Sequence, residues 1–378
     1  MEHKPHLVFE PGLFPTSTYV SRDSDWEGTS YEDRLQLALN TSGFLTVVAG
    51  PSKSGKTTLC HRVVSQGLID IAGSDFHSVD EFWREAACCA DLALDRLSVS
   101  SKDAVIYHYN SQNSTLLISH FQDISSEIRK VMVQQLKDAA GKGLRIIVTM
   151  LPHQVQEMIR LNPDLSGRIS IIQLRPWNTT ELAEIAASGF RQLRIQCSND
   201  LLQFLAEESL SSPGLIQAVC HNIELLLIQS GSVQDAVLDR KTCIKALQQT
   251  ASTPTYQKAA QLLKAGPVQK RAGRTKYLLH DGSSKDLYEL ILKALATDPP
   301  AASIQINALY NRILASIVRD SQKKPTLSSL RRSLNSLLKL TDQQGTNLCR
   351  ILDFHKDTLC ILDPQFLFDL RWNDRLNF

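Results

Sequence analysis

The sequence predicts an α/β core with a parallel sheet and helices on both faces, followed by a helical lid and a C-terminal winged helix-turn-helix domain. Two observations lead to this fold class. Short apolar strands alternate with longer helical segments over residues 44–177, which is the pattern of parallel strands joined by crossover helices. Beyond residue 178 the pattern is helical until two short apolar strands near the C-terminus.

The core follows an irregular segment, residues 1–43, that contains one short helical run, "SYEDRLQLALN". Its first strand is "FLTVVAG", and further strands are expected at 68–72 and in "TLLIS", "RIIVTM" and "RISIIQL". Between them we expect helices near 80–95, in "SSEIRKVMVQQLKDAAGKG" and after Pro152. These alternating lengths indicate one α/β core over 44–177.

The second half of the chain is predicted as lid, linker and winged helix. The lid, 178–252, has helices at 179–193, 199–208, 213–230 and 239–250. Several prolines and glycines predict a linker over 253–283. The final segment, 284–378, has helices at 284–297, 303–318 and 326–340, then the strands "CRILDF" and "TLCILD", which is the order of a winged helix-turn-helix.

Composition sets limits on the function. The chain has 378 residues, 43% of them hydrophobic and 21% charged, which is ordinary for a globular protein. A net charge of +2 means that nucleic-acid binding would need a local basic patch. No signal-peptide core or membrane-spanning run is recognisable, so we expect a cytoplasmic protein without a membrane partner. The eight cysteines form no CxxC pair and are expected to be reduced.

Residues 50–57, "GPSKSGKT", lie between the first strand and a helix and satisfy the P-loop pattern GxxxxGK[ST]. Its glycines allow a tight turn whose N–H groups, with the helix N-terminus, face phosphates. Lys56 would neutralise the β- and γ-phosphates, and Thr57 would offer its hydroxyl to Mg²⁺. The sequence therefore predicts ATP and Mg²⁺ as cofactors, bound by Gly50, Pro51, Ser52, Lys53, Ser54, Gly55, Lys56, Thr57 and Thr58.

The strand that should supply the catalytic acids does not. In P-loop enzymes an Asp at a neighbouring strand end holds Mg²⁺, and a following Glu or Asp orients the attacking water. Here the strand ends in Ser119 and His120; Ser119 can meet only a metal-bound water, and a protonated His120 would repel the ion. Asp123, the next acid, is expected to cap the following helix. The sequence thus favours ATP binding with weak or absent hydrolysis.

These motifs resemble those of bacterial AAA+ ATPases related to the origin-recognition initiators and to STAND signalling ATPases. The resemblance runs nearly end to end, and the P-loop is its most specific motif. Paired Walker B acids and a second sensor arginine in the lid are typical of the family but are not present in this sequence. The matching stretches are "FPTSTYVSR", "GPSKSGKTTL", Phe121, "GLRIIVTMLPHQ", "LNPDLSGRISIIQLRPW" and "ILDPQFLFDLRW".

The resemblance implies roles for several residues. Tyr19, Val20 and Arg22 would pass near the adenine. Thr149 would be the polar sensor that contacts the γ-phosphate or the lytic water. Arg168 would be an arginine finger aimed at a neighbouring subunit, with a solvated loop arginine as the alternative.

The family also implies a function and partners. We expect a regulatory switch whose nucleotide state controls self-association or a co-encoded effector, in settings such as antiphage defence or mobile-element systems. Alternatives are an active ATPase in DNA transactions, with Asp123 or another residue replacing the acids, and an initiator that binds DNA while ATP is structural.

The sequence leaves open whether DNA is a partner. The third helix of the predicted winged helix carries Arg331, Arg332 and Lys339, and the cluster "KRAGRTK" lies at 270–276. The same helix has an apolar stripe that must pack inward, and many winged helices bind proteins instead. Contact with DNA phosphates and a protein-binding role therefore both stand.

Overall fold

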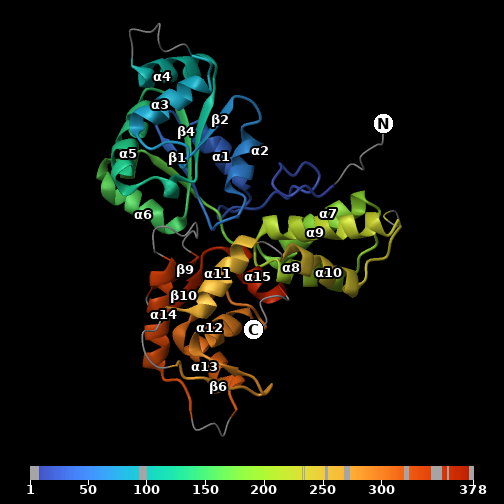
Figure 1. Ribbon diagram of the computed structural model, residues 1–378. Helices are drawn as coiled ribbons and strands as arrows, with labels where there is room; N and C mark the ends of the chain where they lie inside the picture. The colour runs from blue at the N-terminus through green and yellow to red at the C-terminus, as the bar shows by residue number, and fades with distance from the viewer. Residues whose placement is uncertain are drawn as a thin grey trace. The chain divides into compact units, whose positions relative to one another are not determined.

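The computed structural model describes residues 8–92, 100–231, 233, 235–251, 254–267, 273–318, 323–341, 351–355 and 357–373. The chain forms two compact units (Figure 1). The first, called the core unit here, is Tyr19–Trp177. The second, called the helical unit, combines Met1–Thr18 with Asn178–Phe378.

The core unit is built on a five-stranded sheet in the order β2-β3-β4-β1-β5, and every neighbouring pair is parallel. The predicted parallel sheet is confirmed. Because all carboxyl ends of the strands meet at one edge, polar residues that follow different strands are gathered there. The strands are β1 (Leu45–Ala49), β2 (Leu68–Ala72), β3 (Thr115–Ser119), β4 (Arg145–Met150) and β5 (Ile169–Gln173).

Helices cover both faces of this sheet (Figure 1). Alternate residues of β3 separate the two layers: Leu117 packs with α1 and α2, whereas Leu116 and Ile118 pack with the helices of the other face. The first face carries α1 (Tyr31–Leu39) and α2 (Lys56–Val63). The second carries α3 (Val79–Cys88), α4 (Ser101–Ser111), α5 (Ser126–Gly141) and α6 (Pro152–Leu161).

Four helices begin the helical unit: α7 (Thr179–Gln192), α8 (Asn199–Glu208), α9 (Pro213–Gln229) and α10 (Arg240–Thr250). The segment predicted as a linker, 253–283, contains α11 (Pro254–Ala265) and the strand β6 (Tyr277–Leu278), which pairs with β7 (Ser284–Lys285). Ala259, Ala260 and Leu263 of α11 are buried in the hydrophobic core of the C-terminal helices, so this part of the segment is packed.

The C-terminal part has the helix and strand order of the predicted winged helix-turn-helix. Its three strands form an antiparallel sheet in the order β8-β10-β9. The predicted inward stripe of α14 is confirmed, because Leu330, Leu334 and Leu337 are buried. The elements are α12 (Leu287–Ala296), β8 (Ser303–Gln305), α13 (Ile306–Ser316), α14 (Leu327–Thr341), β9 (Leu352–His355), β10 (Thr358–Ile361) and α15 (Pro364–Trp372).

A buried ion pair joins the end of α15 to the end of α8. Arg371 donates from Nε and Nη2 to the two carboxylate oxygens of Glu208 at 2.5 and 2.7 Å. Trp372 Nε1 donates to the same carboxylate at 2.8 Å, and Glu208 is only 7% exposed. The C-terminal motif "LRW" therefore connects α15 to α8 within the helical unit.

The N-terminal segment 8–18 packs on the lid helices within the helical unit. Phe9 is fully buried and contacts the ring of Phe190 with the centroids 5.4 Å apart. The Glu224 carboxylate accepts hydrogen bonds from the backbone N–H groups of Val8 and Phe9, each at 3.2 Å. Gln217, about two turns nearer the start of α9 than Glu224, donates to the Thr18 hydroxyl at 2.5 Å. We call residues 8–18 the N-terminal strap.

Across the described ranges, none of the helices combines the length and the apolar character that a membrane crossing requires.

Candidate functional site

The predicted P-loop connects β1 to α2 and has the geometry that the motif requires. A Cβ atom on Gly50 would lie 2.9 Å from Ser54 Oγ and 3.0 Å from Leu174 Cβ, so a larger residue would clash. Gly55 is the N-cap of α2 with φ of +88°, a conformation that L side chains rarely adopt. These glycines place the loop's amides and the first turn of α2 together at the carboxyl edge of the sheet.

Lys56 lies across this loop. Its ammonium group donates to the carbonyl oxygens of Pro51 at 2.7 Å and Gly50 at 3.1 Å. Burial lowers its pKa from 10.5 to about 8. A bound triphosphate would place negative charge beside this desolvated ammonium.

Two of the predicted site residues, Ser119 and Thr149, end neighbouring strands at the same edge as the P-loop. Both are buried, 5% and 1% exposed respectively. The Thr149 hydroxyl accepts a hydrogen bond from the backbone N–H of His120 at 3.2 Å, so it keeps its own proton to donate. The structure thus brings the loop and both hydroxyls to one edge, as the parallel order of β3, β4 and β1 requires.

At the end of β3, His120 occupies the left-handed region with φ of +54°. Its Nδ1 lies 4.0 Å from the Asp123 carboxylate, and both side chains are about half exposed. Burial raises the pKa of Asp123, and the nearby His120 partly offsets this. The prediction that Asp123 caps the next helix is wrong: the N-cap of α5 is Ser125, because the 3₁₀ turn Phe121–Asp123 intervenes.

The segment expected near the adenine belongs to the core unit. The Tyr19 hydroxyl donates to Glu32 at 2.6 Å, its ring lies 5.0 Å from the Arg62 guanidinium, and burial raises its pKa. Val20 is half-buried. Arg22 is buried between two aromatic rings of the same unit, so its guanidinium is engaged by protein groups.

Arg168 lies at the opposite edge of the sheet from the P-loop. Its carbonyl accepts from the N–H of Leu45, the first residue of β1, at 2.9 Å, and its side chain is exposed. A five-residue strand spans about 17 Å, so Arg168 and its own P-loop lie at opposite ends of β1. This placement excludes a role at its own site and leaves a role at another copy's site as an option.

The three predicted DNA-contacting residues lie on α14 in different settings. Arg331 forms a two-pronged ion pair with Asp357 in the β9–β10 turn, with Nη2 2.9 Å from Oδ2. Arg332 and Lys339 are exposed. Arg274 of the basic cluster pairs with Asp286 at 3.0 Å, and residues 270–272 lie outside the described ranges.

For Mg²⁺, the donor set is sparse. Within the described residues, no group of three or more His, Cys, Asp or Glu side chains is arranged to hold a metal. Thr57 lies in the first turn of α2 and Ser119 at the end of β3, on the same edge of the sheet, so both are hydroxyl groups of the kind that accompany a nucleotide-bound Mg²⁺. Phosphate oxygens and water would complete its shell, which is common for this ion.

Trp177 contacts the P-loop, although no sequence motif identified it as a site residue. Its indole Nε1 donates to the carbonyl oxygen of Ser54, inside the P-loop, at 2.9 Å. The available signal was its position at the end of "RPW", directly after the strand that borders β1.

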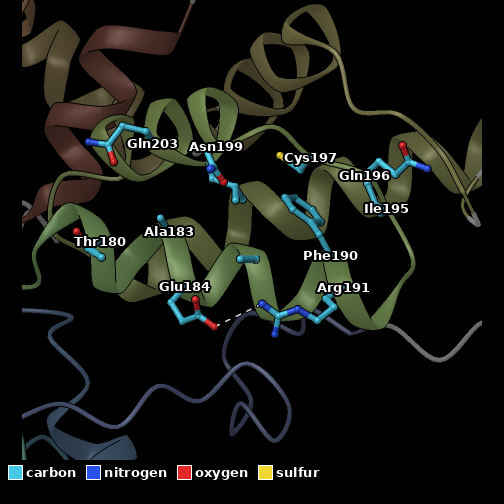
Figure 2. Close-up of a pocket in the computed structure, with 12 residues that line it drawn as sticks. Thr180, Ala183, Glu184, Phe190, Arg191, Ile195, Gln196, Cys197, Asn199 and Gln203 are labelled. Carbon is cyan, nitrogen blue, oxygen red and sulfur yellow. Dashed lines mark ion pairs between the residues drawn. The ribbon is translucent and has the colours of Figure 1, made fainter.

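A separate groove of about 690 Å³ lies on the helical unit between α7 and α8 (Figure 2). Phe190 and Ile195 form its buried floor, and Glu184 pairs with Arg191 at 3.8 Å on one side. The other lining residues are Thr180, Ala183, Ala187, Gln196, Cys197, Asn199, Leu202 and Gln203.

The five-stranded parallel sheet, with a P-loop after its inner strand β1, defines a P-loop NTPase core. No family model and no curated protein matches the chain. Among solved structures, a Walker-type ATPase of Pyrococcus abyssi is 15% identical, covers 90% of this chain and 94% of its own, and has a TM-score of 0.54, which shows a shared fold.

Two further solved structures align over most of this chain. Cdc6p from Pyrobaculum aerophilum is 14% identical over 96% of this chain and 97% of its own, with a TM-score of 0.47. The ORC2 protein of Aeropyrum pernix is 14% identical over 90% of this chain and 89% of its own, with a TM-score of 0.49.

Proposed function

We propose that this protein is an AAA+-like regulatory switch that binds ATP with Mg²⁺ and hydrolyses it weakly or not at all. The observation that carries the proposal is a complete P-loop in the same sheet as a strand, β3, that ends in Ser119 and is followed by His120 where a hydrolytic site needs carboxylates. Nucleotide state would then control the assembly or activity of a partner.

Binding is supported by the loop's chemistry. The amides around Gly55, the desolvated ammonium of Lys56 and the Thr57 hydroxyl suit the phosphates and the metal. Thr149, on the strand that neighbours β1, has a hydroxyl proton that would be free to bind a γ-phosphate. All these groups belong to the core unit, so the proposed phosphate contacts require no residue of the helical unit.

Slow hydrolysis follows from the same edge of the sheet. The Thr149 and Ser119 hydroxyls can orient a water molecule, but neither removes its proton at neutral pH. Asp123 is held by the 3₁₀ turn beyond His120 and faces that imidazole. A bound ATP would therefore persist and act as a signal.

The partner we propose first is a second copy of this chain, with a co-encoded effector as the other candidate. The exposed Arg168, at the edge away from its own P-loop, suits contact with a neighbouring copy's γ-phosphate. ATP-dependent assembly that Arg168→Ala weakens, with Arg160→Ala as an exposed control on α6, would support this partner. Assembly that is independent of ATP and of Arg168 would point to the effector.

Equilibrium binding of ATP and ADP tests the nucleotide claim. Lys56→Ala should abolish ATP binding, while Lys53→Ala, an exposed lysine in the same loop, should reduce it only slightly. Phosphate release above about one turnover per minute that Lys56→Ala abolishes would show an active ATPase and contradict the switch proposal.

The second candidate function is an ATPase or initiator that acts on DNA through the winged-helix part. It is favoured by the exposed Arg332 and Lys339 on α14. This function predicts salt-dependent affinity for duplex DNA that falls when Arg331 and Arg332 are changed to Glu. Affinity that is unchanged by both substitutions would reject it.

A further inference from the structure

The Trp177 indole ties the P-loop to the last residue of the core unit. Trp177 is 9% exposed, and its Nε1–H points at the Ser54 carbonyl oxygen at 2.9 Å. An indole N–H is only a donor, so a backbone carbonyl is its natural partner. The path of the loop backbone at Ser54 is therefore linked to the position of this one ring.

The guanidinium of Arg22 lies over the face of the Trp177 ring. The guanidinium carbon lies 4.1 Å from the centroid of the Trp177 ring and 5.1 Å from that of Tyr31. Its Nη1 donates to the Arg175 carbonyl at 3.1 Å, and Arg22 is 6% exposed. A desolvated cation–π contact with a backbone hydrogen bond fixes both the plane of the indole and the strand that precedes it.

Both residues lie where the chain passes between the two units. The core unit starts at Tyr19, three residues before Arg22, and ends at Trp177 itself. The next residue, Asn178, is the N-cap of α7 and forms a capping box with Glu181, at 2.8 and 3.0 Å. Trp177 and the N-cap of α7 are consecutive residues, so one peptide bond links the residue that carries the indole to the start of the helix.

We propose that Trp177, held by Arg22, is a positioning residue that keeps the P-loop ready for phosphate and transmits its occupancy to α7. This inference rests on the proposed ATP binding and states how occupancy of the nucleotide site would reach α7. When phosphates engage the loop's amides, the Ser54 peptide becomes fixed. The indole that donates to Ser54 and the α7 start attached to it are then fixed as well.

Hydrogen–deuterium exchange with and without Mg²⁺–ATP tests the proposal in the full chain. In the unaltered protein, ATP should slow exchange in the P-loop and in the first turn of α7. Trp177→Phe keeps the ring over Arg22 but removes the donor. It should weaken ATP binding by about fivefold, the value of one neutral hydrogen bond, and abolish the ATP effect on α7 while the loop stays protected.

Trp83→Phe is the matched control, because Trp83 is also buried and donates from its indole to Gln135 at 2.6 Å elsewhere in the core unit. It should keep both effects of ATP. Arg22→Met leaves Trp177 in place and should reproduce the loss at α7, which keeps the test valid if Trp177→Phe folds poorly.

The outcomes separate the two claims. Protection of α7 that survives in both Trp177→Phe and Arg22→Met overturns the coupling and leaves ATP binding intact. An unaltered protein whose P-loop gains no protection from ATP overturns the proposed function, and the coupling with it.

Discussion

Lys56 donates a hydrogen bond to the carbonyl oxygen of Pro51 at 2.7 Å and so spans the loop that it is expected to serve. Burial lowers its pKa from 10.5 to about 8, which means that the folded protein holds this charge at a cost when no phosphate neutralises it. The nucleotide-free site is therefore a destabilising element of the core unit.

We predict that Lys56→Met raises the stability of the nucleotide-free protein at pH 7. The full shift would correspond to about 3 kcal/mol, and the two carbonyl hydrogen bonds offset part of it, so about 1–2 kcal/mol is expected. Below pH 8 both the folded and the unfolded states are protonated and the burial penalty is fully present. As pH rises from about 8 to 10.5 the folded state releases the proton first, so the advantage of the variant should shrink.

Denaturant unfolding of both proteins at pH 7 and pH 10 measures this difference. Lys53→Met, which changes an exposed lysine of the same loop, should show no such gain. A Lys56→Met protein that is less stable than the unaltered chain at pH 7 would mean that the carbonyl hydrogen bonds outweigh the burial.

Restoring the acids should create hydrolysis. Ser119→Asp with His120→Glu places carboxylates at the end of β3, beside the P-loop, where they can hold Mg²⁺ and accept a proton. We expect phosphate release to rise by about tenfold or more. The neutral isosteres Ser119→Asn with His120→Gln are the control and should stay inactive. Equal turnover in both double variants would show that carboxylates at these positions are not what the site lacks.

We predict that the packing of the N-terminal strap against α7 requires a glycine at position 189. A Cβ atom there would lie 2.1 Å from the Phe9 ring, which is buried against α7. Gly189→Ala is expected to destabilise the protein by about 2 kcal/mol through overpacking. Gly214→Ala, at the start of α9 with only Ser212 Oγ nearby at 3.9 Å, is the control.

A double-mutant cycle assigns that loss to Phe9. In a Phe9→Ala background the added methyl group has space, so Gly189→Ala should then be nearly neutral in denaturant unfolding. Equal losses in both backgrounds would mean that Phe9 is not the neighbour that requires the glycine.

The ion pair between Glu208 and Arg371 should stabilise the helical unit strongly. Glu208→Ala leaves the largely buried guanidinium and the Trp372 indole without their carboxylate, and we expect a loss of about 3–5 kcal/mol. Asp103→Ala breaks an ion pair with Lys142 in which both side chains are about half exposed, and it should cost less than about 1 kcal/mol. Thermal unfolding compares them, and similar small losses in both would refute the special role of the Glu208 pair.

The parts of the fold that could be predicted are those that short stretches of sequence encode. The parallel core, the four lid helices and the P-loop were predictable because alternating apolar strands and a fixed glycine spacing are encoded over short stretches. α4 and α11 were missed. The hydrophobic periodicity of α4 is weak, and α11 lies in a segment whose prolines and glycines favour a linker, although its apolar side is buried by distant helices.

The site likewise contains residues that a local pattern predicts and residues that depend on distant contacts. The common edge that holds Thr149 and Ser119 was predictable because both lie at the carboxyl ends of strands in a parallel sheet, whereas the role of Thr149 is implied by the resemblance and stays a prediction. The hydrogen bond of Trp177 to Ser54 and its contact with Arg22 both join residues more than a hundred positions apart. No local pattern encodes such pairs, so only the folded chain reveals them.

The fate of a single bound nucleotide tests the central claim most directly. ATP labelled at the γ-phosphate is mixed with excess protein and Mg²⁺, and the bound nucleotide is extracted and identified over time. We predict that it is recovered as intact ATP, and that Lys56→Ala protein retains none. Conversion of the bound label to free phosphate within minutes would contradict the account.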